Sequence, residues 1–541
     1  MDMNRSGLSG IQQCRMSNFF GLLLTVTAIL AVLPYNGVIC DGQIVSRWIC
    51  AGIAFCVTVP ILSACGLSVS KDSLQTDFVW ICISFALSFA IVLVHSVLQV
   101  TGIVPVSSGN GFRALAGFDN PAGLSAALTV SFPFVLALVD GIGSKRMKYC
   151  IVMLVSVAVL MIMAANGSRT GILAIGAVML LYLFRNMDNA RRRWIASLLF
   201  SLPVIAAVVY LSFLKRASNS GRGLILGVCW NMFRDAPLLG HGMHGFRSQY
   251  MLYQADYLDR GTSSVLPMLA DNVTHPLNEF VLVAVNFGLA GVAVLMATII
   301  ITVRHYIRRP DRESSVGMMV LSGTAVMAMF SYPFRYPLTV LATFFSLLLV
   351  FKDVLQNMGR RLKVVSMSAA VATSVIGLFF IVSWTDLQIR WGRLSAEWES
   401  GGSSARILEG YSELYPKLNK DPYFLYNYAY VLSENGDCGS AARMAAESFD
   451  LMPDYDTALF LADNARECGM PDSAEYYYRL ASRMCPVRFL PLYGLFQLFE
   501  ESGRIEEMQE MGRFILAKPV KVNSNVIRQI RSEVRQILIS F

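Results

Sequence analysis

Long apolar segments separated by short basic clusters constrain the fold of this chain more than any other feature. A helix needs about 20 mostly apolar residues to cross a bilayer, and about eleven such segments precede residue 385. Their approximate ranges are 18–35, 46–66, 77–100, 121–140, 148–165, 170–185, 194–213, 277–303, 315–333, 336–352 and 363–384. Only 15% of the 541 residues are charged, against about 25% in soluble domains. The sequence therefore predicts an all-α, polytopic membrane bundle of about 11–12 transmembrane helices.

The basic residues between these segments predict the orientation of the bundle. Clusters follow the fourth, sixth, eighth and tenth segments and comprise Lys145, Arg146 and Lys148, then Arg185 and Arg191 to Arg193, then Arg304, Arg308, Arg309 and Arg312, then Lys352, Arg360, Arg361 and Lys363. Because Lys and Arg are enriched in cytoplasmic loops, we expect these loops and the N-terminus in the cytoplasm. The large loop 214–276 and the C-terminal part of the chain are then expected on the outer side. The net charge of +8 lacks the basic stripe with interleaved aromatics that would indicate a nucleic-acid binder.

The composition changes near residue 390, and the remainder of the chain repeats. Pro453, Pro486 and Pro519 recur every 33 residues, and Gly436, Gly469 and Gly503 recur at a similar interval. This resembles tetratricopeptide repeats, in which Gly ends the first helix and Pro follows the second helix of each unit. We predict a membrane domain over 1–390, which includes the loop 214–276, and a soluble helical-repeat domain over 391–541. These repeats are compatible with a concave docking surface for a protein partner or a substrate, and equally with a structural cap on the membrane domain.

Cysteine and histidine spacing gives no indication of a metal site. The eleven cysteines form no CxxC pair, and His241 and His244 form an HxxH sequence flanked by glycines, which favours a loop over a ligand-bearing helix. The glycine-rich run there lacks the Lys-Ser/Thr ending of a P-loop. We therefore expect no metal and no cofactor. One disulfide among Cys438, Cys468 and Cys485 is compatible with an oxidising compartment, and its existence and pairing stay open.

Isolated polar groups lie at predicted helix starts on the outer side. Segment 121–140 opens with Asn120 as an N-cap and proline in the first turn. Arg169 opens segment 170–185, Arg222 opens an amphipathic stretch in the large loop, and His275 opens segment 277–303. A helix N-terminus presents free N–H groups and a partial positive charge, and an adjacent arginine makes it an anion site. Arg169 and Arg222 together would suit a diphosphate, and His275 would suit a general base at neutral pH.

Each of these three side chains has a structural alternative. Arg169 is also compatible with a role as an interface anchor whose long side chain reaches out of the membrane to water. Arg222 is also compatible with a surface position in the loop, and His275 with a capping residue at the interface. Spacing alone favours the structural roles slightly.

An ordered set of short motifs nevertheless resembles the O-antigen ligase and O-antigen polymerase superfamily over roughly residues 15–385. The motifs are Gly117-Phe118-Asp119-Asn120-Pro121, Ser168-Arg169-Thr170-Gly171, Ser220-Gly221-Arg222, Pro237-Leu238-Leu239-Gly240-His241-Gly242 with Phe246, and His275-Pro276-Leu277-Asn278-Glu279-Phe280 followed by Gly288-Leu289-Ala290-Gly291. No single motif is specific, but their order raises the functional interpretations above the structural ones. The repeat tail departs from the commonest ligase pattern, and this leaves the acceptor class in doubt.

The resemblance implies a GT-C-type helical bundle in the bacterial inner membrane. It implies metal-independent, inverting transfer of a glycan from undecaprenyl diphosphate to a periplasmic acceptor, which is lipid A-core in ligases, a glycan in polymerases and a protein hydroxyl in O-oligosaccharyltransferases. Arg169 and Arg222 would then bind the diphosphate, and His275 would activate or orient the acceptor hydroxyl. Further substrate-binding candidates are Arg113, Asn120, Gly240, Gly242, Asn278 and Arg335. The C-terminal domain would lie in the periplasm.

Two other function classes compete with the transferase. A transporter of lipid-linked glycans would place ionisable groups near the bilayer midplane, whereas here the polar groups gather at one rim. A non-catalytic assembly scaffold would bind partners through the repeats and would not need Arg169, Arg222 or His275.

Overall fold

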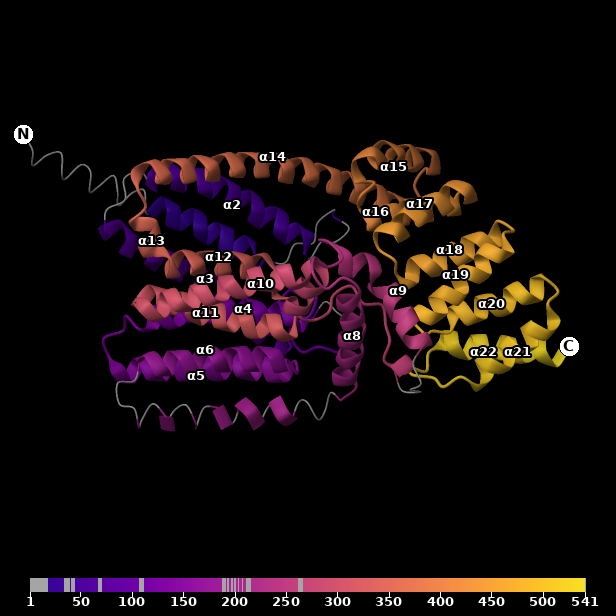
Figure 1. Ribbon diagram of the computed structural model, residues 1–541, viewed down its shortest axis with the longest axis horizontal. Coiled ribbons are helices and arrows are strands. Elements are labelled where there is room, and N and C mark those ends of the chain that lie inside the picture. Colours follow the sequence, from indigo (N-terminus) through magenta and orange to yellow (C-terminus); the bar gives the residue numbers. More distant parts are fainter. Residues whose placement is uncertain are drawn as a thin grey trace, which may run out of the picture. The chain divides into compact units, whose positions relative to one another are not determined.

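The computed structural model describes residues 18–33, 39, 44–66, 71–106, 111–186, 191, 194–195, 198, 201–202, 204–206, 208–210, 216–260 and 266–540, with the backbone alone for 61–66, 71–76 and 216–219. Every element of regular secondary structure in these residues is helical (Figure 1), which confirms the predicted all-α fold class. The chain forms two compact units. The bundle unit comprises Met1–Leu214 and Leu295–Ile389, and the loop–repeat unit comprises Lys215–Val294 and Arg390–Phe541.

The bundle unit contains the apolar helices. They are Asn18–Leu30, α2 (Val45–Gly66), α3 (Lys71–Val100), α4 (Pro121–Val139), α5 (Lys145–Ala165), α6 (Arg169–Asn186), α11 (Arg312–Phe330), η2 (Pro333–Arg335), α12 (Pro337–Val350) and α13 (Lys352–Gln356). Two further helices, α10 (Glu279–Arg308) and α14 (Arg360–Glu399), each pass from one unit into the other.

Six of the described helices are long and apolar enough to cross a membrane, namely α3, α4, α5, α10, α11 and α14. Three further predicted segments form shorter apolar helices at Asn18–Leu30, Val45–Pro60 and Pro337–Val350. Helix α6 coincides with the predicted segment 170–185. The predicted segment 194–213 lies largely outside the described residues. The helical membrane bundle is thus confirmed, and its orientation stays a prediction from charge.

Helix α4 is the central helix of the bundle unit. It contacts α3, α5, α6, α11 and α12, and all of its side chains from Gly123 to Phe134 are buried. Many of these residues are Gly, Ala, Ser or Thr, whose small side chains let neighbouring helices approach closely, as is typical of membrane bundles. Helices α5 and α6 lie side by side (Figure 1). A core that surrounds α4 along its length fixes where the two ends of this helix lie.

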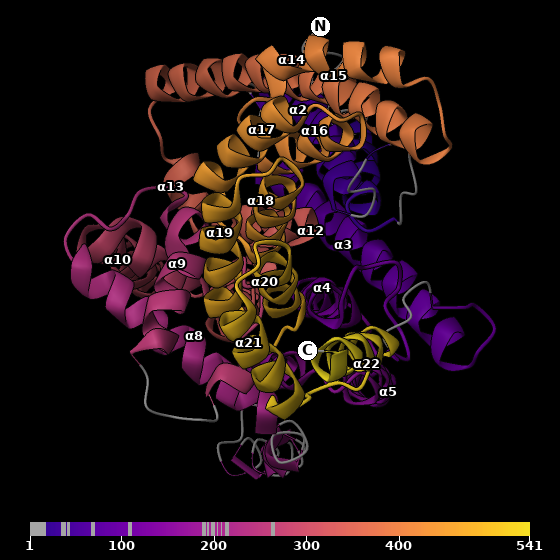
Figure 2. The same cartoon turned by 90° about the vertical axis from the view of Figure 1, so that its right-hand side faces the viewer.

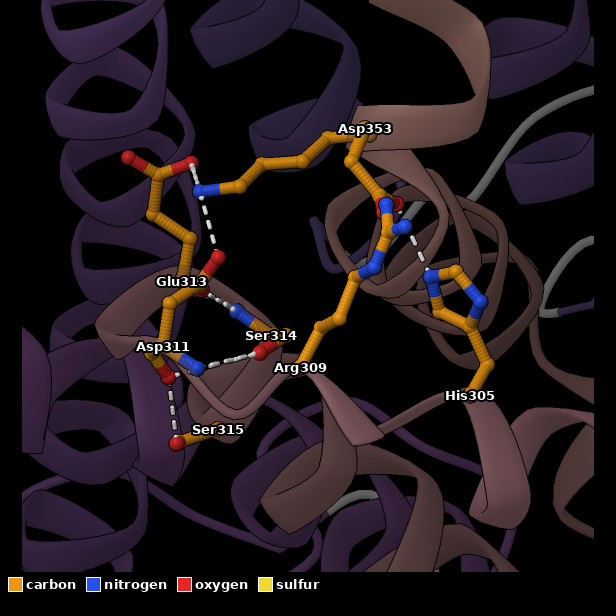
Figure 3. Close-up of polar contacts among 8 residues, drawn as sticks. His305, Arg309, Asp311, Glu313, Ser314, Ser315 and Asp353 are labelled. Carbon is orange, nitrogen blue, oxygen red and sulfur yellow. Dashed lines mark hydrogen bonds and ion pairs between the residues drawn. The ribbon is translucent and has the colours of Figure 1, made fainter. Parts of the chain in front are cut away.

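Polar side chains join the ends of α10, α11 and α13. Nε2 of His305 lies 2.8 Å from a carboxylate oxygen of Asp353 (Figure 3). Nζ of Lys352 bridges Asp311 at 2.9 Å and Glu313 at 2.7 Å. These contacts lie where two of the predicted basic clusters occur, so acidic partners tie both clusters into one end of the bundle.

The loop–repeat unit combines the large loop with the C-terminal helices. The loop supplies α8 (Arg216–Asp235), α9 (Gly245–Asp259) and η1 (Leu266–Met268). The C-terminal part supplies α15 (Ser404–Leu418), α16 (Pro422–Glu434), α17 (Cys438–Leu451), α18 (Tyr455–Glu467), α19 (Pro471–Met484), α20 (Leu490–Glu501), α21 (Ile505–Ala517) and α22 (Asn525–Ser540). From α15 to α22 each helix contacts the next one along the chain, and α17 to α21 follow one another in a stack (Figure 2). Such nearest-neighbour stacking is the architecture of helical repeats.

The loop and the repeats share one hydrophobic core. Loop residues such as Val228, Tyr250 and Met251 form a single buried cluster with Leu480 and Met484 of α19, and α9 contacts both α17 and α19. The sequence assigned the loop to the membrane domain. That division stays a prediction. In the structure α9 packs against α17 and α19 of the C-terminal part.

Candidate active site

Asn120 begins α4 and links that helix to the segment before α12. Its Oδ1 accepts from two N–H groups of the first turn, as the sequence predicted. Its Nδ2 donates to the hydroxyl of Tyr332 at 3.0 Å. The hydroxyl of Tyr336 donates to Asp119 at 2.9 Å. The segments that carry Asn120 and Arg335 therefore lie together at one end of the bundle unit.

Arg169 is the first residue of α6, as predicted. The side chain of Asn166, just before it, accepts from the backbone N–H of Arg113 at 3.2 Å and from the next N–H at 3.1 Å. Ser168 lies 2.6 Å from a serine hydroxyl of α4. Hydrogen bonds thus join the segments that carry Arg113 and Arg169 to each other and to α4.

Two consecutive residues of α2, which the sequence analysis missed, support these segments. Arg47 is fully buried, donates to the carbonyl of Gly117 at 2.7 Å and lies 4.3 Å from the ring centre of Phe118. Nε1 of Trp48 donates to the carbonyl of Arg335 at 2.8 Å. An arginine inside an apolar segment is by default a candidate functional or supporting residue, because burying a charge there is costly. That indication was present in the sequence.

In the loop–repeat unit, the glycine-rich turn after α8 packs against a kink in α10. The kink lies at Gly288, whose φ of 59° and ψ of −156° are not helical. A Cβ at Gly240 would lie 2.4 Å from the carbonyl carbon of Asn286, and one at Gly288 would lie 2.5 Å from the carbonyl of Leu238. The N–H of Gly242 donates to the carbonyl of Asn286 at 2.9 Å. The structure gives Gly240 a packing role and Gly242 a backbone hydrogen bond, and the contact of both with substrate stays a prediction.

Asn286 is a third residue that the sequence analysis missed. Its side chain is buried, donates to the carbonyl of Met243 at 2.9 Å and accepts from the N–H of Phe246 at 2.9 Å. It therefore ties the start of α9 to α10. Nε2 of His241 lies 2.7 Å from the carbonyl of Met232, at the end of α8, so this histidine is engaged by the backbone.

His275 lies in the loop before α10 and not at its start. The helix begins at Glu279, with the side chain of Asn278 accepting from the N–H of Val281 at 3.1 Å. The prediction that His275 opens this helix is therefore wrong, because Asn278 supplies the cap. Nδ1 of His275 accepts from the N–H of Leu277 at 2.9 Å. Leu277 has a φ of 56°, which is uncommon for a residue with a Cβ.

This hydrogen bond fixes the tautomer of neutral His275. One ring nitrogen of a neutral imidazole accepts and the other donates. Since Nδ1 accepts from the backbone, Nε2 carries the proton. Nε2 lies 3.6 Å from a carboxylate oxygen of Glu279, with side-chain exposures of 22% for His275 and 16% for Glu279. The pair thus presents an N–H donor beside an acceptor carboxylate, and both groups remain partly accessible.

Arg222 lies within α8 rather than at its start. Helix α8 begins at Arg216, so the prediction that Arg222 opens a helix is wrong. The apolar face of α8, which includes Leu224, Val228 and Met232, is buried against the rest of the unit. Packing of that face keeps the glycines on both sides of Arg222 in the helical conformation, although glycine has a low helix propensity. An anion-binding role for Arg222 therefore relies on its guanidinium alone.

Residues 154–296 match the family model described as O-Antigen ligase. This segment of the chain is therefore similar to the O-antigen ligase family. No curated protein matches the chain. The matched segment contains Arg169, Arg222 and His275, whereas the C-terminal helices lie outside it. The match supports a bacterial membrane glycan transferase of the ligase or polymerase type.

Candidate residues lie in each of the two units. The bundle unit joins the segments of Arg113, Asn120, Arg169 and Arg335 through part-buried hydrogen bonds of amide, serine and tyrosine side chains. Guanidinium groups bind phosphate oxygens with a matching fork of N–H donors. The loop–repeat unit supplies Arg222 and the His275–Glu279 pair. The first set is suited to an anionic headgroup, and the second set is suited to proton transfer.

Proposed function

We propose that this chain transfers a glycan from undecaprenyl diphosphate to a hydroxyl of lipid A-core or a related surface lipid, on the periplasmic side of the inner membrane. The observation that carries the proposal is the set of arginine-bearing segments joined at one end of the bundle unit. Lipid-diphosphate binding needs several cationic donors at a membrane rim, and the family match supports a lipid-linked glycan and an acceptor as partners in general.

Arg169 and Arg222 would bind the donor diphosphate, with Arg113 and Arg335 assisting. In the transfer, the acceptor oxygen forms a bond to the anomeric carbon while the bond from that carbon to the phosphate oxygen breaks. The electron pair goes to the leaving undecaprenyl diphosphate. Arginines aimed at the diphosphate would stabilise the charge that develops on it. Displacement in line with the leaving group inverts the configuration at the anomeric carbon, and no nucleotide is needed because the donor already carries its leaving group.

The proton of the acceptor hydroxyl must also be removed. With its proton on Nε2, neutral His275 would donate a hydrogen bond that orients the acceptor oxygen. The adjacent carboxylate of Glu279 would then receive the proton. Of the two family roles for His275, this geometry supports orientation more directly than abstraction of the proton by the imidazole.

Two other acceptors define the alternatives within the same superfamily. A polymerase would use a second lipid-linked glycan, and a protein O-oligosaccharyltransferase would use a serine or threonine hydroxyl. The repeat helices beside the loop favour the protein acceptor to some extent, because helical repeats commonly bind peptides along their stacked faces.

Metal- and nucleotide-free turnover would test the proposal. Purified protein is incubated with undecaprenyl-diphosphate oligosaccharide and each acceptor class, and release of undecaprenyl diphosphate is measured. Arg169→Ala and Arg222→Ala are compared with the wild type and with Arg406→Ala, a matched control at an exposed arginine of α15. Acceptor-dependent release that both site variants lose and the control keeps would support the transferase. No release with any acceptor, or release unchanged in both site variants, would favour a transporter or a scaffold.

A further inference from the structure

Gln254 of α9 is a fully buried polar residue whose hydrogen-bonding groups are all engaged. Its Nε2 donates to the carbonyl of Asp271 at 3.0 Å and to the carbonyl of Met484 at 2.8 Å. Its Oε1 accepts from the hydroxyl of Tyr250 at 3.0 Å. A primary amide has two N–H donors, so each donor meets one carbonyl. Removing this side chain would leave three polar groups without this partner. Two of the three hydrogen bonds are fully buried, so their loss is costly in a low-dielectric interior.

The two carbonyls belong to different parts of the loop–repeat unit. Met484 is the last residue of α19, where helix carbonyls lack partners within the helix. Asp271 lies in the irregular stretch between η1 and α10, just upstream of His275. Gln254 therefore joins three segments: helix α9, the end of a repeat helix, and the backbone that leads to His275.

Neighbouring contacts bind the same stretch to the repeats. Arg488 donates to the carboxylate of Asp271 at 2.8 Å, and the side chain of Asn272 donates to Asp456 at 3.2 Å. Burial would raise the pKa of the Asp271 carboxyl, but hydrogen bonds from Arg488 and a backbone N–H lower it overall. Asp271 thus stays ionised and paired at neutral pH. Ala270, beside it, is completely buried in the core shared by the loop and α19.

The stretch from Leu269 to Asn278 forms no helix of its own. An irregular segment relies on contacts with its surroundings for a fixed conformation. Here the described contacts at Ala270, Asp271 and Asn272 come from α9 and from the repeats.

We propose that Gln254 is a positioning residue for glycan transfer: it ties the backbone upstream of His275 to the end of α19, so that the repeats set the position of His275. This inference rests on the proposed function. In this proposal the repeats hold the loop that carries His275 in position. This role differs from a docking surface and from a cap on the membrane domain. A displacement of about 1 Å at a reacting group can lower a rate roughly 10²-fold.

The test uses the full-length protein in detergent with undecaprenyl-diphosphate oligosaccharide and the productive acceptor. Gln254→Leu removes all three hydrogen bonds with little change in volume. Asp259→Asn is the matched control, because it breaks another contact of α9 with α19, the Asp259–Arg483 ion pair at 3.3 Å, without touching the stretch before His275. We expect Gln254→Leu to lower kcat by about 10- to 100-fold while KM for the lipid donor stays within about twofold. The control should match the wild type.

Amide hydrogen exchange gives a readout that does not depend on activity. In Gln254→Leu, peptides covering 269–276 should exchange roughly tenfold faster, while α20 and α21 keep their protection. Should Gln254→Leu fail to fold, the ion pair offers a second route. Asp271→Arg and Arg488→Asp should each lower kcat, and the double variant should restore it, because exchanging the two charges keeps their attraction.

Wild-type kcat together with wild-type exchange over 269–276 in Gln254→Leu would overturn the proposal. So would faster exchange spread over all repeats, or a double variant with no recovery, since both indicate a general loss of structure. If the wild type transfers no glycan to any acceptor, the proposed function fails by itself, and the exchange data still decide whether Gln254 fixes this stretch.

Discussion

The tautomer of His275 leads to a prediction that separates its possible roles. His275→Asn keeps an acceptor oxygen near the place of Nδ1, and so keeps the hydrogen bond from the Leu277 N–H, but it has no group at the place of Nε2. His275→Gln instead puts an amide N–H near Nε2. If His275 acts as a donor, His275→Asn should lower kcat about 10²–10³-fold, the usual effect of removing one preorganised donor, and His275→Gln should retain clearly more activity. His275→Ala should also lose about 1 kcal/mol of stability with the local hydrogen bond.

Glu279 completes the series, because its carboxylate is the acceptor beside Nε2 at 3.6 Å. Glu279→Gln keeps the shape but cannot take a proton, so kcat should fall about 10²–10⁴-fold. The assay is release of undecaprenyl diphosphate at saturating donor and acceptor, with melting temperatures measured in the same detergent. Asp256→Asn, at an exposed carboxylate of α9, serves as the control. The reasoning is refuted if His275→Gln is as inactive as His275→Ala while Glu279→Gln remains active, because the imidazole itself would then be the base.

Three further predictions concern the support of the site and the repeats. Gly288→Ala should destabilise the protein by at least about 3 kcal/mol. The φ of 59° and ψ of −156° at this position favour glycine, and a Cβ there would lie 2.5 Å from backbone atoms. A wild-type melting temperature would contradict this prediction. Trp48→Phe removes the N–H group that donates to the Arg335 carbonyl at 2.8 Å, so the free energy of unfolding should fall by about 0.5–1.5 kcal/mol. KM for the glycan-carrying lipid should rise severalfold. An unchanged KM would reject a role for Trp48 in binding this lipid. Cys438 and Cys468 are free thiols in the structure, and burial together with a hydrogen bond from Cys438 raises the pKa of Cys468 to about 11. We predict that these two cysteines form a disulfide in an oxidising compartment, which mass spectrometry would detect. Separate alkylation of both thiols would exclude the pairing.

Local sequence patterns predicted some helix starts correctly and others incorrectly. The starts at Asn120 and Arg169 were correct because a cap and a proline, or a turn with glycine, act within a few residues. The starts at Arg222 and His275 were wrong for opposite reasons. Because its apolar face packs against the rest of the unit, α8 begins before Arg222 and includes the neighbouring glycines. Helix α10 begins after His275 because Asn278 is the stronger cap.

The buried amides were invisible in the sequence. Asn166, Gln254 and Asn286 each bridge backbone groups of different segments, and no spacing rule links an amide to a carbonyl that is distant in the chain. The pairing of His275 with Glu279 was available from their i, i+4 spacing, but only the loop conformation at Leu277 shows which imidazole nitrogen faces the carboxylate.

The sequence by itself determined the helical membrane bundle and the motif set that resembles the O-antigen ligase superfamily, and it predicted repeats in the C-terminal part, which is helical. These features depend on composition, on periodicity and on caps that act over one turn of helix. Only the tertiary structure decided that the large loop shares its core with the repeats, and that Gln254 and Asp271 connect the segment of His275 to α19. Such contacts join residues far apart in the chain, and their free energy depends on burial and on the pairing of polar groups, which exist only once the chain has packed.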